Sequence, residues 1–291
     1  IAARHAEDWL HLTTRQNVQM HFVQLEQTPE LLRLLASVDL TSREACGDTV
    51  RNVTGCHLAG ACPFEVLDIS PWAKATTDFF LRNPYAQRLP RKFKINFSGC
   101  VTDCGQAMFN DVGVIGVNRP KPDGTLEPGF KVFVAGGLGA NPHPAQALEE
   151  FTPREQLMPT LEAIVRVFDH YGNRDNKLRA RMKWLVDTMG MEELRERIFK
   201  ERKFLPAASS YPGGIPDAVQ EHGDAPAGAG KGPVTQVGEA PVSFLGLTQY
   251  ERWENANVVR GRAHGPVSAY AYARLGDITW DQFRQLAEIR R

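Results

Sequence analysis

Four cysteines constrain the fold of this 291-residue chain more than any other feature. Cys56 and Cys62 form a C-x5-C pair, and Cys100 and Cys104 form a C-x3-C pair after a gap of 37 residues. Thiolates are soft ligands, and a set of four is what an iron–sulfur cluster of the 4Fe–4S type requires. The pattern therefore predicts that two distant loops meet around one metal centre.

The cysteine set also admits a zinc site or buried free thiols as alternatives. Zinc knuckles usually separate two cysteines by roughly two to four residues, and the spacing of Cys56 and Cys62 exceeds that range. Free thiols would leave unexplained why four of the five cysteines gather in two tight pairs. We therefore favour an iron–sulfur cluster, and we interpret Cys46, which lies outside the pattern, as a buried free thiol.

Composition narrows the class of protein further. Lys and Arg together number 34, as do Asp and Glu, so the net charge does not point to nucleic acid or to a membrane surface. An odd cysteine count in so long a chain argues against a disulfide framework and favours a reducing, cytoplasmic location. No run of about 18 apolar residues is present, so no transmembrane helix is expected. The first residue is Ile1 rather than Met, so we expect a fragment or a processed chain.

Hydrophobic periodicity predicts both strands and helices. We expect strands over residues 17–25, 92–97, 112–117 and 131–134. We expect helices from Thr28 onward and over residues 72–81, 153–171, 176–189 and 192–203. Residues 206–241 are dominated by Pro, Gly and Ala, as is typical of a linker, and residues 242–291 regain the pattern of a small α+β unit.

Basic side chains accompany both cysteine pairs. Lys92 and Lys94 alternate along a predicted strand, so both point to one face while Phe93 and Ile95 point to the other. An edge strand with a solvated face has the same pattern. Because Lys94 lies six residues before the second cysteine pair, we instead expect both lysines beside the metal centre. Arg51, five residues before the first pair, is expected there for the same reason.

A polar strand face near the start of the chain offers further candidates. Arg15 precedes the strand predicted over residues 17–25, and its guanidinium can bind a carboxylate through two nitrogens. His21 lies on the same face of that strand as Asn17 and Gln19. A histidine in such a position is most often half-buried and hydrogen-bonded, and contact with a cofactor is the alternative.

These residues give the chain a resemblance to the siroheme-dependent nitrite/sulfite reductase family. The resemblance covers residues 1–205 and, more weakly, residues 242–291. It is carried by the cysteine set followed by Gly105 and by the segments LTTRQNVQ (12–19), GDTVRNV (47–53), LPRKFK (89–94) and NDVG (110–113). Each segment alone is weakly specific, whereas their combination is highly specific.

The resemblance implies a siroheme stacked beside a 4Fe–4S cluster. The four paired cysteines would hold the cluster, and Cys104 would also bridge to the siroheme iron. Arg51, Lys92 and Lys94 would bind the anionic substrate or neutralise siroheme carboxylates. The implied siroheme contacts are Arg15, Gln19, His21, Arg51 and Asn52. The implied reaction is the six-electron reduction of sulfite to sulfide or of nitrite to ammonia.

The expected architecture is α+β, with a mixed-sheet core for siroheme and cluster flanked by helices, plus a small ferredoxin-like α+β unit. The expected domains are the end of a ferredoxin-like unit at 1–40, a siroheme and 4Fe–4S binding domain at 41–205, the linker at 206–241 and a ferredoxin-like half domain at 242–291. The last residues, 285–290, resemble the first four, which indicates one period of a repeated architecture.

The implied partners are a small anion and an external electron donor such as ferredoxin or a reductase subunit. The glycines of 136–139 do not form the Gly-x-Gly-x-x-Gly motif, so we do not expect bound NAD(P). The alternative function is a non-catalytic, cluster-bearing subunit with a role in electron transfer or structure.

Overall fold

The computed structural model describes residues 1–211, 247–260 and 267–289. The predicted linker therefore lies outside the described residues from position 212 onward. The chain divides into two compact units, which are considered separately. The larger spans Glu44–Ser268, and the smaller combines Ile1–Arg43 with Ala269–Arg291.

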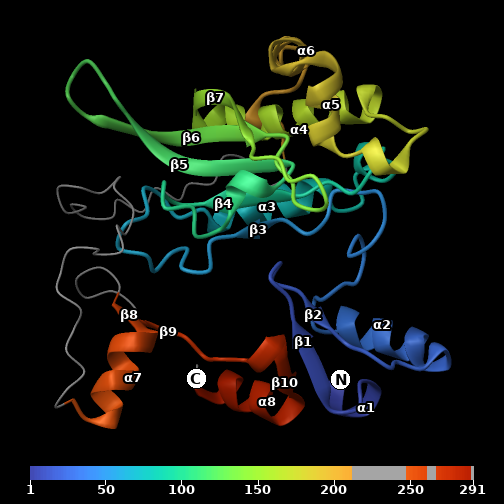
Figure 1. Ribbon diagram of the computed structural model, residues 1–291, viewed down its shortest axis with the longest axis vertical. Coiled ribbons are helices and arrows are strands. Elements are labelled where there is room, and N and C mark those ends of the chain that lie inside the picture. The colour runs from blue at the N-terminus through green and yellow to red at the C-terminus, as the bar shows by residue number, and fades with distance from the viewer. Residues whose placement is uncertain (212–246, 261–266, 290–291) are drawn as a thin grey trace. The chain divides into compact units, whose positions relative to one another are not determined.

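The larger unit is built on a five-stranded mixed sheet (Figure 1). The strand order is β3-β4-β5-β6-β7, with parallel pairing from β3 to β5 and antiparallel pairing from β5 to β7. The strands are β3 (Thr54–Gly55), β4 (Ile95–Ser98), β5 (Val112–Pro120), β6 (Leu126–Val134) and β7 (Gln146–Thr152). This confirms the predicted α+β architecture with a mixed sheet, and it adds β7, a strand that the periodicity missed.

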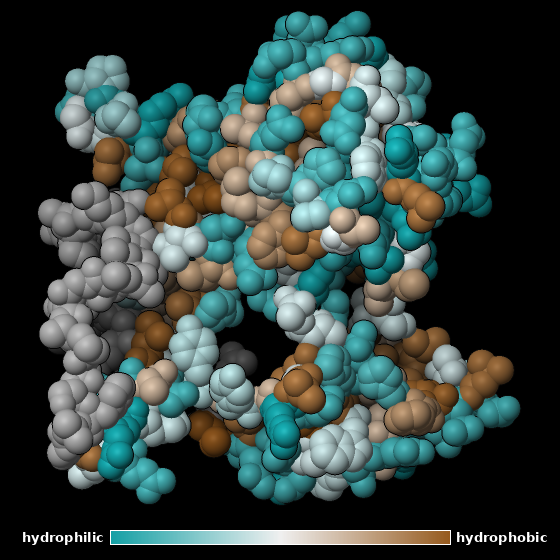
Figure 2. Space-filling model, viewed as in Figure 1, coloured by the Kyte–Doolittle hydropathy of each residue, from teal (hydrophilic) through white to brown (hydrophobic). Residues whose placement is uncertain are grey.

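Four helices pack with this sheet, and Figure 1 shows α4, α5 and α6 grouped beside β6 and β7. They are α3 (Ser70–Phe80), α4 (Arg154–Tyr171), α5 (Met182–Met189) and α6 (Met191–Arg202). The Trp72 ring of α3 lies 5.1 Å from the Phe130 ring of β6. Between the helices, the Thr76 hydroxyl donates to the Met158 sulfur of α4 at 3.5 Å. Hydrophilic residues dominate the outer surface over α6 (Figure 2), which leaves the apolar side of that helix for the core.

The predicted alternation before the second cysteine pair is confirmed. Phe93 and Ile95 are fully buried, whereas Lys92 and Lys94 are partly exposed. The Phe93 ring packs 5.1 Å from that of Phe168 in α4. The regular strand is shorter than predicted, because Phe93 makes only an isolated parallel bridge and the ladder of β4 begins two residues later.

The smaller unit joins segments from opposite ends of the sequence. Its elements are α1 (Ala2–His5), β1 (Trp9–Leu12), β2 (Val18–Gln19), α2 (Thr28–Ala36), β10 (Asp277–Thr279) and α8 (Trp280–Ile289). The sheet order is β10-β1-β2, with both pairs antiparallel. Leu10 and Ile278 face each other across β1 and β10 and are buried together with Ala2 and Ala6.

Two predicted elements are longer than the observed ones. The strand expected over residues 17–25 is reduced to β2, because the backbone of Phe22 adopts a φ of 61°, which extended strands do not allow. The helix expected over residues 176–189 is a short 3-10 turn, Lys177–Arg179, followed by α5.

The remaining described elements belong to the segment after the linker. Helix α7 (Gln249–Asn257) begins with a capping box between Thr248 and Glu251. Strands β8 (Val258–Arg260) and β9 (Val267–Ala269) form a two-stranded ladder. Within the described ranges, no helix is both long enough and apolar enough to cross a membrane.

Candidate metal centre and cationic cluster

The sheet topology explains how the two cysteine pairs meet. The C-x5-C pair follows β3 and the C-x3-C pair follows β4, and these strands are parallel neighbours with Gly55 opposite Phe97. Because parallel neighbours end at the same edge of a sheet, the two loops begin side by side. The backbone N–H of Cys56 donates to the carbonyl of Phe97 at 2.9 Å, which fixes the first loop against the second strand.

The four thiols face one another in two hydrogen-bonded pairs. Cys62 pairs with Cys100, and Cys56 pairs with Cys104. Across the described part of the chain, no group of three or more His, Cys, Asp or Glu side chains is gathered closely enough to hold a single metal ion. The mutual interactions of Cys56, Cys62, Cys100 and Cys104 place the four thiols around a common space. This arrangement fits a cluster, which has several irons to share among its ligands.

Burial and hydrogen bonding give the thiols different proton affinities. Burial raises the pKa of Cys56 to about 11 and also raises the pKa of Cys104. The hydrogen bond from Cys62 lowers the pKa of Cys100 to about 6, and the same bond raises the pKa of Cys62. Four thiolates at this site would repel one another, so a cationic metal centre is needed to hold them together.

The C-x3-C loop is held in shape by Asp103, which the sequence did not single out. The backbone of Asp103 adopts a φ of 55°. Its carboxylate accepts hydrogen bonds from the Ser98 hydroxyl at 2.6 Å, from the Ala107 N–H at 2.6 Å and from the Met108 N–H at 3.1 Å. The side chain thus ties the end of β4 to the turn that follows Cys104.

We expect Asp103→Ala to lower the melting temperature and the cluster content together. Three hydrogen bonds to one carboxylate are lost, at a cost of about 1–3 kcal/mol. The measurements are thermal unfolding and the iron and acid-labile sulfide bound per chain. Asp123→Ala is the matched control, because that carboxylate caps an exposed turn at Thr125. If both variants bind equal amounts of iron, the proposed loop-holding role of Asp103 is wrong.

Several cations gather around Lys92, and we call Arg51, Arg91, Lys92 and Arg181 the cationic cluster. Burial lowers the pKa of Lys92, and repulsion from Arg181, Arg51 and Arg91 lowers it further. In the described residues the Lys92 ammonium forms no ion pair. The carboxylate of Asp111 acts in the opposite direction and raises the pKa of Lys92. The excess of positive charge is suited to a small anion or to the carboxylates of a cofactor.

Other members of the predicted set lie in the same unit. The Arg51 guanidinium donates to the carbonyls of Gly47 at 3.0 Å and Ala45 at 2.7 Å, so it also shapes its own loop. Asn52 and Lys94 are partly exposed. Cys46, predicted to be a buried thiol, is exposed, so that prediction was wrong. Its neighbours Ala45 and Gly47 are also exposed, so this stretch lies on the surface rather than against the core.

Arg15, Gln19 and His21 lie in the smaller unit. Arg15 occupies the turn between β1 and β2, where the Thr13 hydroxyl accepts its backbone N–H at 3.3 Å. His21 is exposed rather than half-buried, which corrects the expectation for that residue. Its ring centroid lies 6.3 Å from that of His11, which pairs with Gln19 across the strands.

His11 joins this polar face without having been predicted. Its ring nitrogen lies 2.8 Å from the carboxylate of Asp277, a residue 266 positions further along the chain. The contact depends on pairing of β1 with β10, which local sequence patterns do not reveal. The available signal was a single polar residue in β1, whose four residues read Trp-Leu-His-Leu.

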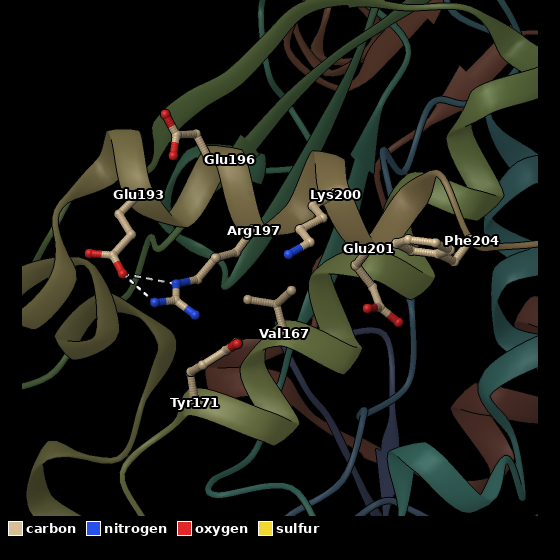
Figure 3. A pocket seen from close by; sticks show the side chains of 8 residues that line it. All are labelled: Val167, Tyr171, Glu193, Glu196, Arg197, Lys200, Glu201 and Phe204. Carbon is tan, nitrogen blue, oxygen red and sulfur yellow. Dashed lines mark hydrogen bonds and ion pairs between the residues drawn. The ribbon is translucent and has the colours of Figure 1, made fainter.

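A groove of about 720 Å³ lies elsewhere in the larger unit (Figure 3). Its walls come from Val167 and Tyr171 of α4 and from the stretch 193–204 on and after α6. The Arg197 guanidinium points to Glu193, to which it donates hydrogen bonds. None of the predicted site residues lines this groove, and its charges are largely paired, so it is not a candidate for the anion site.

Comparison with known proteins agrees with this picture. Residues 46–204 match the family described as the nitrite and sulphite reductase 4Fe-4S domain. Residues 1–38 match the nitrite/sulfite reductase ferredoxin-like half domain. The second match accounts for the ferredoxin-like part of the expected architecture.

Individual relatives give the same result. The chain is 38% identical over 195 residues to an assimilatory ferredoxin-dependent nitrite reductase of Haloferax mediterranei, covering 66% of this chain and 33% of the relative. It is 37% identical over 201 residues to sulfite reductase (ferredoxin) 1 of Mycolicibacterium paratuberculosis, covering 69% of this chain and 35% of the relative. The solved structure of the Mycobacterium tuberculosis NirA protein superposes with a TM-score of 0.65 at 36% identity, over 71% of this chain and 37% of that chain.

The chain thus spans about a third of the length of the curated relatives it matches. The matched residues 46–204 contain both cysteine pairs and the Lys-x-Lys segment. On these grounds the chain belongs to the nitrite and sulphite reductase 4Fe-4S domain family.

Proposed function

We propose that this chain holds a 4Fe–4S cluster coupled to a siroheme and takes part in the six-electron reduction of sulfite or nitrite. The observation that carries the proposal is the meeting of four thiols at the ends of β3 and β4, in the same unit as the cationic cluster. An external donor, ferredoxin or a reductase subunit, would supply the electrons, and the names of the relatives favour ferredoxin. We expect the protein to work in the cytoplasm.

The cofactors would provide the iron that binds substrate and the path for electrons. The donor set fits the cluster, because four cysteine thiolates are its usual ligands. Cys104 would serve as the ligand shared with the siroheme iron. The acidic groups of a siroheme suit guanidinium, amide and imidazole partners, for which Arg15, Gln19, His21 and Asn52 are the candidates.

The basic residues would bind the anion and deliver protons. Each oxygen that leaves the substrate departs as water, and this requires protons as well as electrons. Arg51, Lys92 and Lys94 would stabilise the negative charge of the bound anion. Because burial and neighbouring cations lower the pKa of Lys92, its Nζ is better suited to give up a proton than an ordinary lysine.

The proposed domain organisation follows the same resemblance. Residues 41–205 would form the siroheme and cluster domain. Residues 1–40 would be the end of a ferredoxin-like unit that leads into the core, and residues 242–291 would be a ferredoxin-like half domain after the linker at 206–241. The pairing of β1 with β10 joins residues 9–11 and 277–279 in one sheet.

We expect Lys94→Ala and Lys92→Ala to lower reduction of sulfite and nitrite while the cluster content stays unchanged. Removing one charge-stabilising donor costs on the order of 10²-fold in turnover. Turnover is measured with a chemical reductant, and iron and labile sulfide are measured on the same samples. Lys121→Ala is the control, because that lysine lies in the exposed turn between β5 and β6. Unchanged turnover in both variants would remove the lysines from the proposed site.

A further inference from the structure

Asp111 is a fully buried carboxylate that contacts the Lys-x-Lys segment directly. It lies immediately before β5 and has no exposed surface. One carboxylate oxygen accepts the Nε–H of Arg181 at 2.9 Å. The other accepts a second Arg181 N–H at 2.7 Å and the backbone N–H of Lys94 at 2.9 Å. Three donors thus converge on a carboxylate that water does not reach.

The bond to Lys94 fixes the backbone just before a regular strand begins. The neighbouring residue Phe93 is held by main-chain bonds to Thr49 at 2.9 Å and to Arg51 at 2.8 Å. The carbonyl of Lys94 accepts the backbone N–H of Val112 at 3.0 Å. The backbone N–H of Lys94, in contrast, donates to the Asp111 side chain. The backbone position of Lys94 therefore depends in part on the Asp111 side chain, and substitution of Asp111 can change that position.

Arg181 supplies the other half of the arrangement. It is the residue before the first turn of α5, and only 14% of its side chain is exposed. Its planar guanidinium presents two parallel N–H groups to the carboxylate, a geometry that a lysine ammonium does not reproduce. The same guanidinium is the strongest of the cationic neighbours that act on Lys92. The orientation of Arg181 therefore affects the field at Lys92 as well as the position of Lys94.

We propose that Asp111 and Arg181 form a positioning pair that places Lys92 and Lys94 for binding a small oxyanion. The inference rests on the proposed function, because it assumes that the cationic cluster is the substrate site. Neither member is assigned a contact with the substrate. The pair acts through the two lysines, by holding the backbone of one and orienting the guanidinium that faces the other.

Arg181→Lys is the most informative variant, since it keeps the charge and loses the two-pronged contact. The measurement is a titration of the oxidised holoprotein with sulfite, followed through the change in its absorption spectrum. We expect the dissociation constant to rise roughly tenfold in Arg181→Lys, because a bidentate charge-assisted contact is lost. Arg179→Lys is the matched control, because Arg179 is exposed and contacts Trp184 instead.

A double-mutant cycle separates positioning from a purely structural role. If the pair acts through the two lysines, Arg181→Lys should change sulfite affinity little once Lys92→Met and Lys94→Met are both already present. Equal affinity in the wild type and Arg181→Lys, or additive effects in the cycle, would overturn the inference. Should Arg181→Lys lose its cofactors, Asp111→Glu, which keeps the charge, is titrated in the same way and must also weaken binding.

The wild type distinguishes failure of this inference from failure of the proposed function. If the wild-type holoprotein binds neither sulfite nor nitrite, the proposed function fails, and the positioning pair fails with it. If the wild type binds sulfite and the variants bind equally well, the proposed function stands and the positioning role is wrong.

Discussion

Replacing Cys104 with serine is expected to abolish both cluster binding and reduction of sulfite or nitrite. A serine hydroxyl is a much weaker ligand for iron than a thiolate, because soft ligands are what iron–sulfur clusters require. Cys104 is also hydrogen-bonded to Cys56 on the other loop, so its loss weakens the meeting of the two pairs. Cluster iron and labile sulfide should fall from about four of each per chain to near zero.

The control for this experiment is Cys46→Ser. Cys46 is an exposed free cysteine outside the two pairs. The Cys46→Ser protein should therefore bind as much iron as the wild type. The comparison removes effects of thiol loss in general, such as altered oxidation during purification. Full cluster content and activity in Cys104→Ser would contradict the assignment of this residue as a cluster ligand.

Gly105→Ala is expected to destabilise the larger unit and to empty the metal centre at the same time. A Cβ atom added at Gly105 would lie 2.3 Å from the carbonyl oxygen of Phe97, 2.7 Å from the Ser98 hydroxyl and 2.8 Å from the Asn96 side-chain oxygen. The first of these atoms is backbone of β4 and cannot swing away. Since the loop must shift, and since Gly105 is bonded directly to Cys104, we expect the ligand set to lose its geometry.

The expected loss of stability is about 1–3 kcal/mol, the usual range for overpacking a well-filled core. Denaturant unfolding of the holoprotein measures it, and iron content reports the metal centre. Gly124→Ala serves as the comparison, because a methyl group there meets nothing within 4 Å although its φ is 83°. Gly124→Ala should lose only the stability that an alanine in a left-handed backbone conformation costs, and it should keep its iron. A Gly105→Ala protein with wild-type iron content would show that the loop tolerates displacement.

The metal centre could be predicted because its signal is local in sequence. Cysteine pairs of fixed spacing lie in two loops, and the second loop follows a predicted strand, residues 92–97, that alternates in hydrophobicity. Phe93 and Ile95 are buried and the lysines beside them are partly exposed, as the alternation requires. The larger helices were predicted for the same reason, since their apolar stripes recur every three or four residues.

The residues that hold the site together could not be predicted. Asp103 and Asp111 are single carboxylates whose roles depend on backbone N–H groups brought near by folding. Arg181 reaches Asp111 across 70 positions, and no spacing rule connects them. The His11–Asp277 contact likewise depends on strand pairing between the two ends of the sequence. Such contacts are consequences of the tertiary fold.

Some predicted elements failed because a local pattern was overridden. The alternation over residues 17–25 continues past β2, but the chain turns at Phe22 and the strand ends. Strand β7 was missed because its burial alternates irregularly beside a bulge in its pairing with β6. Alternation shows which residues are suited to a strand, whereas pairing partners decide where the strand begins and ends.

The most direct test of the central claim is an anaerobic absorption spectrum of the purified chain, with iron, zinc and acid-labile sulfide quantified. The protein should come from a host that makes siroheme. We predict siroheme bands together with about four cluster irons and four sulfides per chain. A cluster without siroheme would favour the alternative of an electron-transfer or structural subunit. Bound zinc, or four free thiols with no iron or sulfide after anaerobic purification, would contradict the account.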